Sequence, residues 1–544
     1  MKKVFLLVLV IASLTGMAFA GGSSESETAA PAPAAAATAA APAVDDKAGG
    51  VLVFGRAGDS VGLDPARETD GESFYATHQV FDTLVEFKTG TTEIVPALAT
   101  SWDVSDDNLT YTFHLREGVK FHDGTPMNAD AVVFSLDRQL SEDHPYHEYG
   151  PWKYWLNYMG MSDIVGSITA KDDMTVVFSL QKPEAPFIAN LAMDFAGIVS
   201  PTAFMADPEG FSSNPVGTGP FKFVSWTKDS DIVLDKNEDY WEEVQLDRLI
   251  LKVIPDATAR WLALQKGEVD VIDFPAADDL PAMAADPDVE LIQQSGMNVG
   301  YLALNNEKKP YDDKRVRQAM NYAIDRDEII AAVYGSAGQV AKNPIPPNVW
   351  SYNDDIEPYP YDVDKAKALL AEAGYADGFK TEIWAMPVAR PYNPDARKIA
   401  EIMQAQLAKI NVEVEIISYE WGTYLDKCDF GEHQAAMLGW TGDNGDPDNF
   451  LWVLLSAPSA VPPAGNIAFW KNDEFTALIK EAKETADVAK RTQLYMDAQV
   501  VFHEEAPWVT IAHSVVTVPV SSAVQNFKIS PTGTRVFKSV WLEK

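Results

Sequence analysis

Hydrophobic positions follow regular periods along most of the chain. From Leu109 to Leu115, apolar residues alternate with polar ones, and this period of two predicts a half-buried strand. Short apolar runs without alternation predict strands that are buried on both faces. Such runs occupy residues 51–54, 232–234, 249–254 and 435–438.

Two stretches have features typical of helices. Val316, Ala319, Met320 and Ala323 recur at helical spacing, which predicts a helix over residues 312–334 capped by its first residue. A second helix is expected over residues 73–84. Strands and helices then alternate to about residue 513, as in an α/β fold.

The chain begins with an apolar run of another kind. Two lysines precede apolar residues 4–17, and Ala18-Phe19-Ala20 supplies the small residues of a cleavage site. The run is too short for a comfortable membrane span. We therefore predict a cleaved signal peptide over residues 1–20 and a periplasmic location, although retention of the signal as an anchor stays open.

Composition narrows the possible partners. A length of 544 residues predicts two or three domains, and a hydrophobic content of 47% predicts that they are globular. The Ala- and Pro-rich residues 21–50 predict a flexible tether. The net charge of −37 disfavours nucleic acid and anionic membrane surfaces as partners. Cys428 is the single cysteine, so no internal disulfide, thiolate metal cluster or lipid-anchor cysteine is expected. We expect a monomer without a cofactor.

The stretch 58–62 matches the G-x-S-x-G pattern of a hydrolase nucleophile elbow at Ser60. That elbow requires a helix directly after the serine, whereas Gly62 and Pro65 follow here. A strand-to-loop turn is therefore favoured, and a secreted serine hydrolase using Ser60 remains the alternative from another functional class. The next loop, with Asp70, Gly71 and Glu72, could line a cleft or simply enter the following helix.

Four longer stretches resemble one known family. They are residues 102–124, 128–138, 214–222 and 309–325. Together they are similar to the solute-binding receptors of peptide-type ABC importers, and the resemblance extends from Val51 to the C-terminus. It implies an α/β, two-lobed periplasmic-binding-protein fold with an extra subdomain inserted in the first lobe, and a membrane permease as the partner.

The resemblance also implies domain boundaries. The first lobe is expected over residues 51–80, 212–298 and 514–544. The inserted subdomain is expected over residues 81–211, and the second lobe over residues 299–513. The segments that cross between the lobes are expected near Val299 and His513.

Two predicted strand ends in the second lobe carry opposite charges. Asp443 follows the apolar run 435–438, and Arg390 follows another apolar strand and precedes two prolines that stiffen its loop. A zwitterionic peptide needs this combination, because its ammonium prefers a carboxylate and its carboxylate prefers a guanidinium. Two extended residues span roughly 7 Å, so a fixed pair of charges can select peptide length.

The same stretches resemble the dipeptide-binding branch of the family. The aspartate after Trp-Thr-Gly, which holds the peptide ammonium there, matches Asp443, and the arginine before Pro-Tyr, which holds the carboxylate, matches Arg390. Tyr392 and Trp440 match pocket-lining positions. The resemblance implies a receptor that captures dipeptides by lobe closure and does not act as an enzyme. Longer peptides, glutathione, haem, an oligosaccharide or a metal chelate remain open as ligands.

Overall fold

The computed structural model describes residues 49–543. The predicted signal peptide and the tether up to residue 48 lie outside the described residues. Among residues 49–543, no helix combines the length and the hydropathy that a membrane crossing requires.

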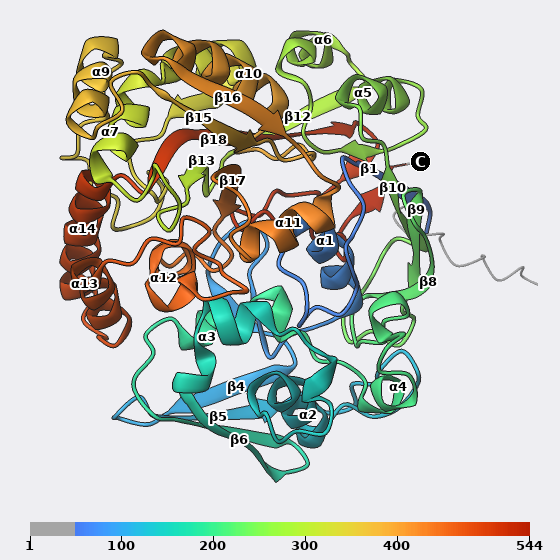
Figure 1. The fold of residues 1–544 in the computed structure, drawn as a ribbon. Coiled ribbons are helices and arrows are strands. Elements are labelled where there is room, and N and C mark those ends of the chain that lie inside the picture. Colours follow the sequence, from blue (N-terminus) through green and yellow to red (C-terminus); the bar gives the residue numbers. More distant parts are fainter. Residues whose placement is uncertain (1–48, 544) are drawn as a thin grey trace, which may run out of the picture. The chain divides into compact units, whose positions relative to one another are not determined.

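A twelve-stranded mixed sheet is the framework of residues 49–543 (Figure 1). Its hydrogen-bonded order is β16 (Val412–Ile417), β15 (Phe379–Trp384), β17 (Ala435–Thr441), β13 (Asn298–Leu304), β18 (Trp508–Ser521), β11 (Val271–Ile272), β1 (Val51–Arg56), β10 (Arg248–Val253), β9 (Asp231–Lys236) and β8 (Phe221–Thr227). Two further strands pair with β18, namely β12 (Val289–Ser295) and β14 (Gly338–Val340). The continuous apolar runs of the sequence therefore do form strands.

Strand β18 belongs to both halves of this sheet. Its first residues, from Trp508 to Ala512, pair with β13, and its last residues, from Val515 to Ser521, pair with β12. Nearly every residue of β18 is buried, so both of its faces are covered. The chain thus passes from one half to the other along a single continuous strand.

Helices cover the two halves separately (Figure 1). One half carries α7 (Lys314–Ala323), α8 (Arg326–Ile329), α9 (Val363–Glu372), α10 (Ala396–Leu407), α11 (Trp421–Asp429), α12 (Asp448–Leu455), α13 (Asp473–Lys483) and α14 (Val488–Glu505). The other half carries α1 (Gly71–Val80), α5 (Ala257–Gln265) and α6 (Leu280–Ala285). The fold is mixed α/β, as the sequence predicts.

A separate antiparallel sheet lies within residues 99–180. Its order is β4 (Ala99–Val104), β5 (Thr110–Leu115), β7 (Thr175–Leu180) and β6 (Val165–Asp172), and α2 (Ala129–Leu140) packs on it. Alternate residues of β5 are buried, which confirms the predicted half-buried strand. This sheet falls inside the predicted subdomain 81–211, whose boundaries remain a prediction. Smaller elements are β2 (Val85–Phe87), β3 (Ile94–Pro96), α3 (Phe187–Asn190), α4 (Pro201–Ala206), β19 (Val524–Gln525) and β20 (Trp541–Leu542).

Both predicted helices differ from the observed ones. Helix α1 begins at Gly71, because the Asp70 carboxylate caps it by accepting hydrogen bonds from the amides of Glu72 and Ser73. Gly71 and Glu72 therefore belong to the first helical turn and not to a loop. The predicted helix over 312–334 is interrupted after Ala323, because Asp325 caps a new helix.

Candidate functional site

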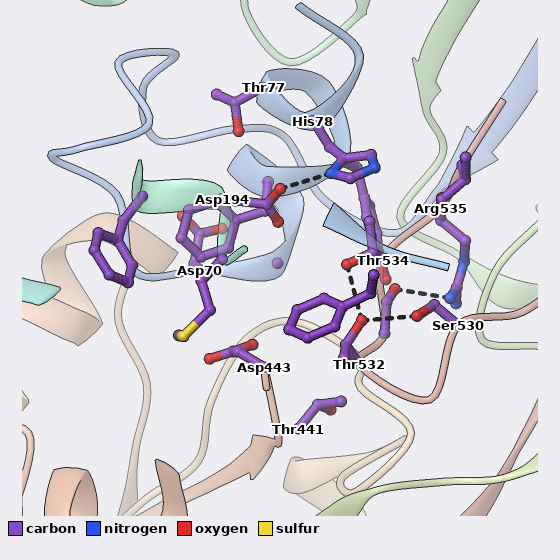
Figure 2. Close-up of a pocket in the computed structure, with 18 of the residues that line it drawn as sticks. Asp70, Thr77, His78, Asp194, Thr441, Asp443, Ser530, Thr532, Thr534 and Arg535 are labelled. Carbon is purple, nitrogen blue, oxygen red and sulfur yellow. Dashed lines mark hydrogen bonds and ion pairs between the residues drawn. The ribbon is translucent and has the colours of Figure 1, made fainter. Parts of the chain in front are cut away.

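One cavity collects residues from distant parts of the chain (Figure 2). It encloses about 1720 Å³ of space not filled by atoms, part of it open to solvent. Six of the predicted site residues line it, namely Asp70, Gly71, Arg390, Tyr392, Trp440 and Asp443. The seventh, Glu72, lies behind Arg390 and contacts its guanidinium. The structure thus brings the predicted residues together around one space.

Asp443 stands just beyond the end of β17. Its amide donates to Oδ1 of Asn449 at 2.8 Å, and its carboxylate accepts a short hydrogen bond from the Tyr154 hydroxyl. Burial raises the pKa of Asp443 to about 7, the charge of Asp194 adds to this, and the hydrogen bonds from Tyr154 and Asn449 oppose it. Within residues 49–543, no cationic side chain forms an ion pair with Asp443. This carboxylate is therefore held by neutral donors alone.

Asn449, in the first turn of α12, organises this end of the cavity. Its Oδ1 also accepts from the Trp440 indole at 2.9 Å, and its Nδ2 donates to the Tyr154 hydroxyl at 3.0 Å. One amide side chain thereby fixes the aspartate, the tryptophan and the tyrosine. Sequence reasoning overlooked Tyr154, which lies in a π-helical turn over Lys153–Tyr158, and gave Asn449 no role.

Arg390 is buried, with 6% of its surface exposed. Its Nη1 donates to Oε1 of Glu72 at 2.9 Å and to the carbonyl oxygen of Ala389 at 2.8 Å. The guanidinium carbon lies 5.3 Å from the ring centroid of Trp421 and 5.8 Å from that of Phe274. Nη2 is buried and has no hydrogen-bond partner among the described residues. Arg390 as a residue lines the cavity, so its guanidinium supplies the positive charge at this end of the space.

The Arg390 loop is held rigidly against the sheet. The amides and carbonyls of Arg390 and Asn393 bond to each other at 3.0 and 2.9 Å. Tyr392 packs on β17 so closely that a Cβ atom at Gly439 would overlap its ring. Its carbonyl oxygen accepts from the Tyr334 hydroxyl at 2.7 Å. Small residues in β17 therefore allow the loop to approach the strand.

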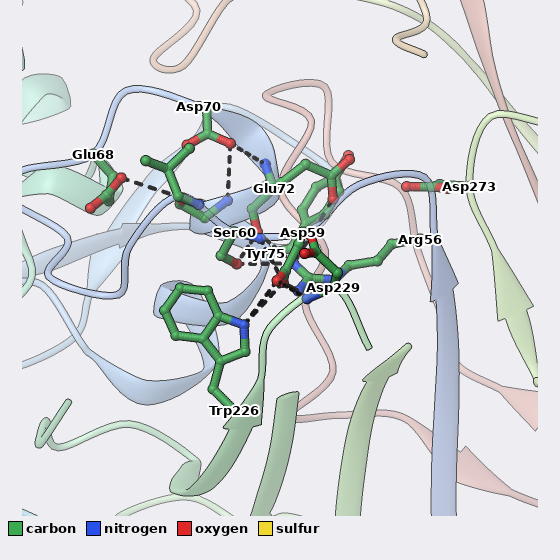
Figure 3. A network of polar contacts seen from close by, with 12 residues as sticks. Arg56, Asp59, Ser60, Glu68, Asp70, Glu72, Tyr75, Trp226, Asp229 and Asp273 are labelled. Carbon is green, nitrogen blue, oxygen red and sulfur yellow. Dashed lines mark hydrogen bonds and ion pairs between the residues drawn. The ribbon is translucent and has the colours of Figure 1, made fainter. Parts of the chain in front are cut away.

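Glu72 is fully buried and accepts a hydrogen bond from Arg390. Figure 3 shows the polar network to which Glu72 and Arg56 belong. Its Oε2 lies 3.9 Å from Nη1 of Arg56 and has no hydrogen-bond partner among the described residues. Burial raises the pKa of Glu72, while the charges of Arg390 and Arg56 act in the opposite direction. The cationic end of the cavity is thus already paired inside the protein.

Ser60 belongs to the same network. Its hydroxyl accepts from Nη1 of Arg56 at 3.0 Å and donates to the carbonyl oxygen of Glu72 at 3.0 Å. The side chain is 1% exposed, and no helix follows directly. The structure therefore places Ser60 in a strand-to-loop turn that supports α1, as the sequence favours.

The far wall of the cavity carries neutral hydroxyls and an ion pair (Figure 2). Thr532 lies between Ser530 and Thr534, with hydroxyl distances of 2.8 and 3.1 Å. Asp194 binds Nδ1 of His78 at 2.7 Å. These residues line the same cavity as Arg390 and Asp443.

Known proteins resemble the chain along most of its length. Residues 93–460 match the family model described as bacterial extracellular solute-binding proteins, family 5 Middle. A dipeptide-binding protein of Escherichia coli (strain K12) is 46% identical over 506 residues, which cover 90% of this chain and 94% of the relative. Heme-binding protein A of Haemophilus influenzae is also 46% identical, covering 90% of this chain and 92% of the relative.

A solved structure agrees with these relatives. The periplasmic binding protein DppA of Helicobacter pylori, in complex with the peptide STSA, superposes with a TM-score of 0.87 at 43% identity, covering 92% of this chain and 99% of that one. This match confirms the predicted α/β periplasmic-binding-protein fold, whereas the inserted subdomain stays a prediction. The chain belongs to family 5 of the bacterial extracellular solute-binding proteins.

Proposed function

We propose that the chain is an extracytoplasmic receptor that captures dipeptides and delivers them to the permease of an ABC transporter. The observation that carries this proposal is the pair of opposite charges on one cavity. Arg390 has an unpartnered donor, and Asp443 has no cationic partner among residues 49–543. A peptide carboxylate and a peptide ammonium complement these two groups.

Calorimetric titration tests the assignment of the two ends. Ala-Ala is expected to bind, whereas N-acetyl-Ala-Ala and Ala-Ala amide each lack one charged end and are expected to bind at least tenfold more weakly. Replacing Arg390 by Ala should remove the discrimination against the amide but not that against the acetylated peptide. Equal affinities of the wild type for all three ligands would contradict the proposal.

Lobe closure is the proposed mode of capture, with the segments near Val299 and His513 as the crossings. Residues on both sides of these crossings line the cavity, among them Asp70 and Asp443. Small-angle scattering with and without Ala-Ala should show a smaller radius of gyration in the bound protein. An unchanged radius together with confirmed binding would contradict closure.

A longer peptide is the second candidate ligand. The cavity supports it, because Ser530, Thr532 and Thr534 also line the cavity and offer hydroxyl groups to a longer peptide. The peptide in the Helicobacter pylori complex, STSA, is a tetrapeptide. Competition between di-, tri- and tetra-alanine separates the two candidates. Native mass spectrometry of the purified protein would reveal haem or glutathione if either were the ligand.

We further propose that the receptor does not cleave its ligand. The relatives reported above are binding proteins, and the buried Ser60 hydroxyl is engaged by Arg56 and Glu72. Esterase and peptidase assays on the wild type and Ser60→Ala are expected to give no serine-dependent turnover.

We also propose export by the signal peptide over residues 1–20 without a lipid anchor, which N-terminal sequencing of the periplasmic protein would test.

A further inference from the structure

Arg390 and Glu72 form an ion pair between positions 318 residues apart. Glu72 is fully buried and Arg390 is 6% exposed, so water screens their interaction little. One oxygen of Glu72 accepts from Nη1 of Arg390. Its other oxygen and Nη2 of Arg390 have no hydrogen-bond partner among the described residues. The pair is therefore only half satisfied on each side.

The buried charges around this pair balance one for one. The cations are Arg56, Arg260, Arg390 and Arg535, and the facing carboxylates are Asp59, Asp70, Glu72 and Asp273. They come from β1 and its loop, the start of α1, helix α5, the end of β11, the 390–394 loop and the C-terminal segment. Tyr75 of α1 also faces the group and stays neutral, since burial raises its pKa.

A ligand carboxylate beside the Arg390 guanidinium, which lines the cavity, would disturb this balance. It would share one guanidinium with Glu72 and bring two carboxylates close together in a buried place. Two such carboxylates cannot both stay ionised without a large free-energy cost. Burial already raises the pKa of Glu72, and Asp273 and Asp70 act in the same direction. Glu72 is the group that would give up its charge most easily.

We propose that Glu72 occupies the carboxylate end of the site as an internal counter-ion and takes up one proton from solvent when a ligand carboxylate binds to Arg390. No bond of the ligand forms or breaks. Glu72 thereby acts as a positioning residue through Arg390, and its protonated oxygen becomes a donor. The inference rests on the proposed function, because it requires a ligand with a carboxylate.

The proton is measurable by calorimetry. Ala-Ala is titrated into the wild type and Glu72→Gln near pH 7.5, in two buffers with different ionisation enthalpies, which gives the number of protons taken up. Asp443 releases a proton when it binds the ammonium, so the informative quantity is the difference between the two proteins. We expect the wild type to take up more protons than Glu72→Gln, by a difference approaching one. With Ala-Ala amide, which lacks the carboxylate, the difference should vanish.

A second measurement uses the wild type alone, so it tests the inference even if Glu72→Gln fails to fold. Between pH 6.5 and 8.5, the affinity for Ala-Ala should fall relative to that for Ala-Ala amide, by up to about tenfold per pH unit. A pH-independent ratio, or equal proton numbers in both proteins with Ala-Ala, would overturn the inference. If Ala-Ala gives no binding heat with the wild type, the proposed function itself is wrong.

Discussion

The two charged residues that line the cavity, Arg390 and Asp443, differ in the partners that the protein itself gives them. Arg390 is buried and carries its own counter-ion, Glu72, at 2.9 Å. Asp443 is half-buried and is held by Tyr154 and Asn449, which are neutral. Removing Arg390 therefore leaves the buried Glu72 carboxyl with only the more distant Arg56, at 3.9 Å, whereas removing Asp443 leaves no charged group without its partner. The comparison teaches that one charged group of a binding site can be neutralised by the protein itself, while the other is left for a charged group of the ligand.

The largest expected effect comes from breaking the Arg390 end. Arg390→Met keeps a long side chain beside Trp421 and Phe274 but leaves Glu72 buried without its nearest cation. We expect the free energy of unfolding to fall by at most about 3–5 kcal/mol, the usual cost for one partner of a buried pair, because Glu72 can relieve part of this cost by taking up a proton. Urea unfolding at neutral pH measures this loss.

The control for this prediction is the double variant Arg390→Met with Glu72→Gln. It removes both charges, so it should recover at least half of the stability that the single variant loses. A double variant no more stable than Arg390→Met would show that Glu72 is not the group left unpaired.

The next largest effect concerns ligand affinity at the Asp443 end. Asp443→Asn keeps the shape but removes the charge, and breaking a buried charge pair with the ligand costs about 2–5 kcal/mol. The dissociation constant for Ala-Ala should rise by about a hundredfold or more. The free energy of unfolding should not fall, because no cation among residues 49–543 pairs with Asp443 and burial disfavours its charged form.

A matched control exists on the same cavity. Asp194→Asn changes another lining carboxylate, one that already pairs with His78. Its effect on Ala-Ala affinity should be below about threefold. Equal losses in the two variants would mean that the general negative charge of the cavity, and not Asp443, attracts the ammonium.

A smaller effect is expected from Tyr154→Phe, which removes one donor to the Asp443 carboxylate. A hydrogen bond to a charged group contributes about 1.5–3 kcal/mol, so affinity at neutral pH should fall at least tenfold. Because the Tyr154 hydrogen bond lowers the pKa of Asp443, its loss should also move the acid limb of the affinity profile to higher pH. A loss of affinity with an unmoved pH profile would count against this explanation.

The last prediction concerns the pH dependence of stability. Burial raises the pKa of Asp443 to about 7 and that of Glu68 to about 8. The folded protein then binds more protons than the unfolded chain, so stability should decrease as pH rises from about 5 to about 8. Arg390 stays charged throughout and adds no slope. Urea midpoints should therefore depend less on pH near 7 in Asp443→Asn than in the wild type.

Sequence patterns predicted the elements that depend on local information. The alternation in residues 110–115 requires only a strand with one face toward solvent and one toward the core, and β5 has both faces. Helix boundaries were less accurate, since the capping aspartates Asp70 and Asp325 look like any other acidic residue in the sequence.

The residues of the cavity likewise divide into those that local sequence patterns predict and those that tertiary packing alone brings there. Arg390 and Asp443 follow strands, and their placement at one cavity follows from strand order. The contact between Arg390 and Glu72 joins residues 318 positions apart, and no local pattern reports it. Tyr154 lies in an irregular helical turn outside any predicted element. Its approach to Asp443 depends on tertiary packing, which periodicity cannot show.

Strand β18 has a consequence for how the chain acquires its structure. Residues 508–521 are synthesised long after β13 and β12, yet both of these strands need them as a neighbour. Until they arrive, each half of the sheet exposes an unpaired edge. The nascent chain therefore cannot complete either half of the large sheet before this strand has been synthesised.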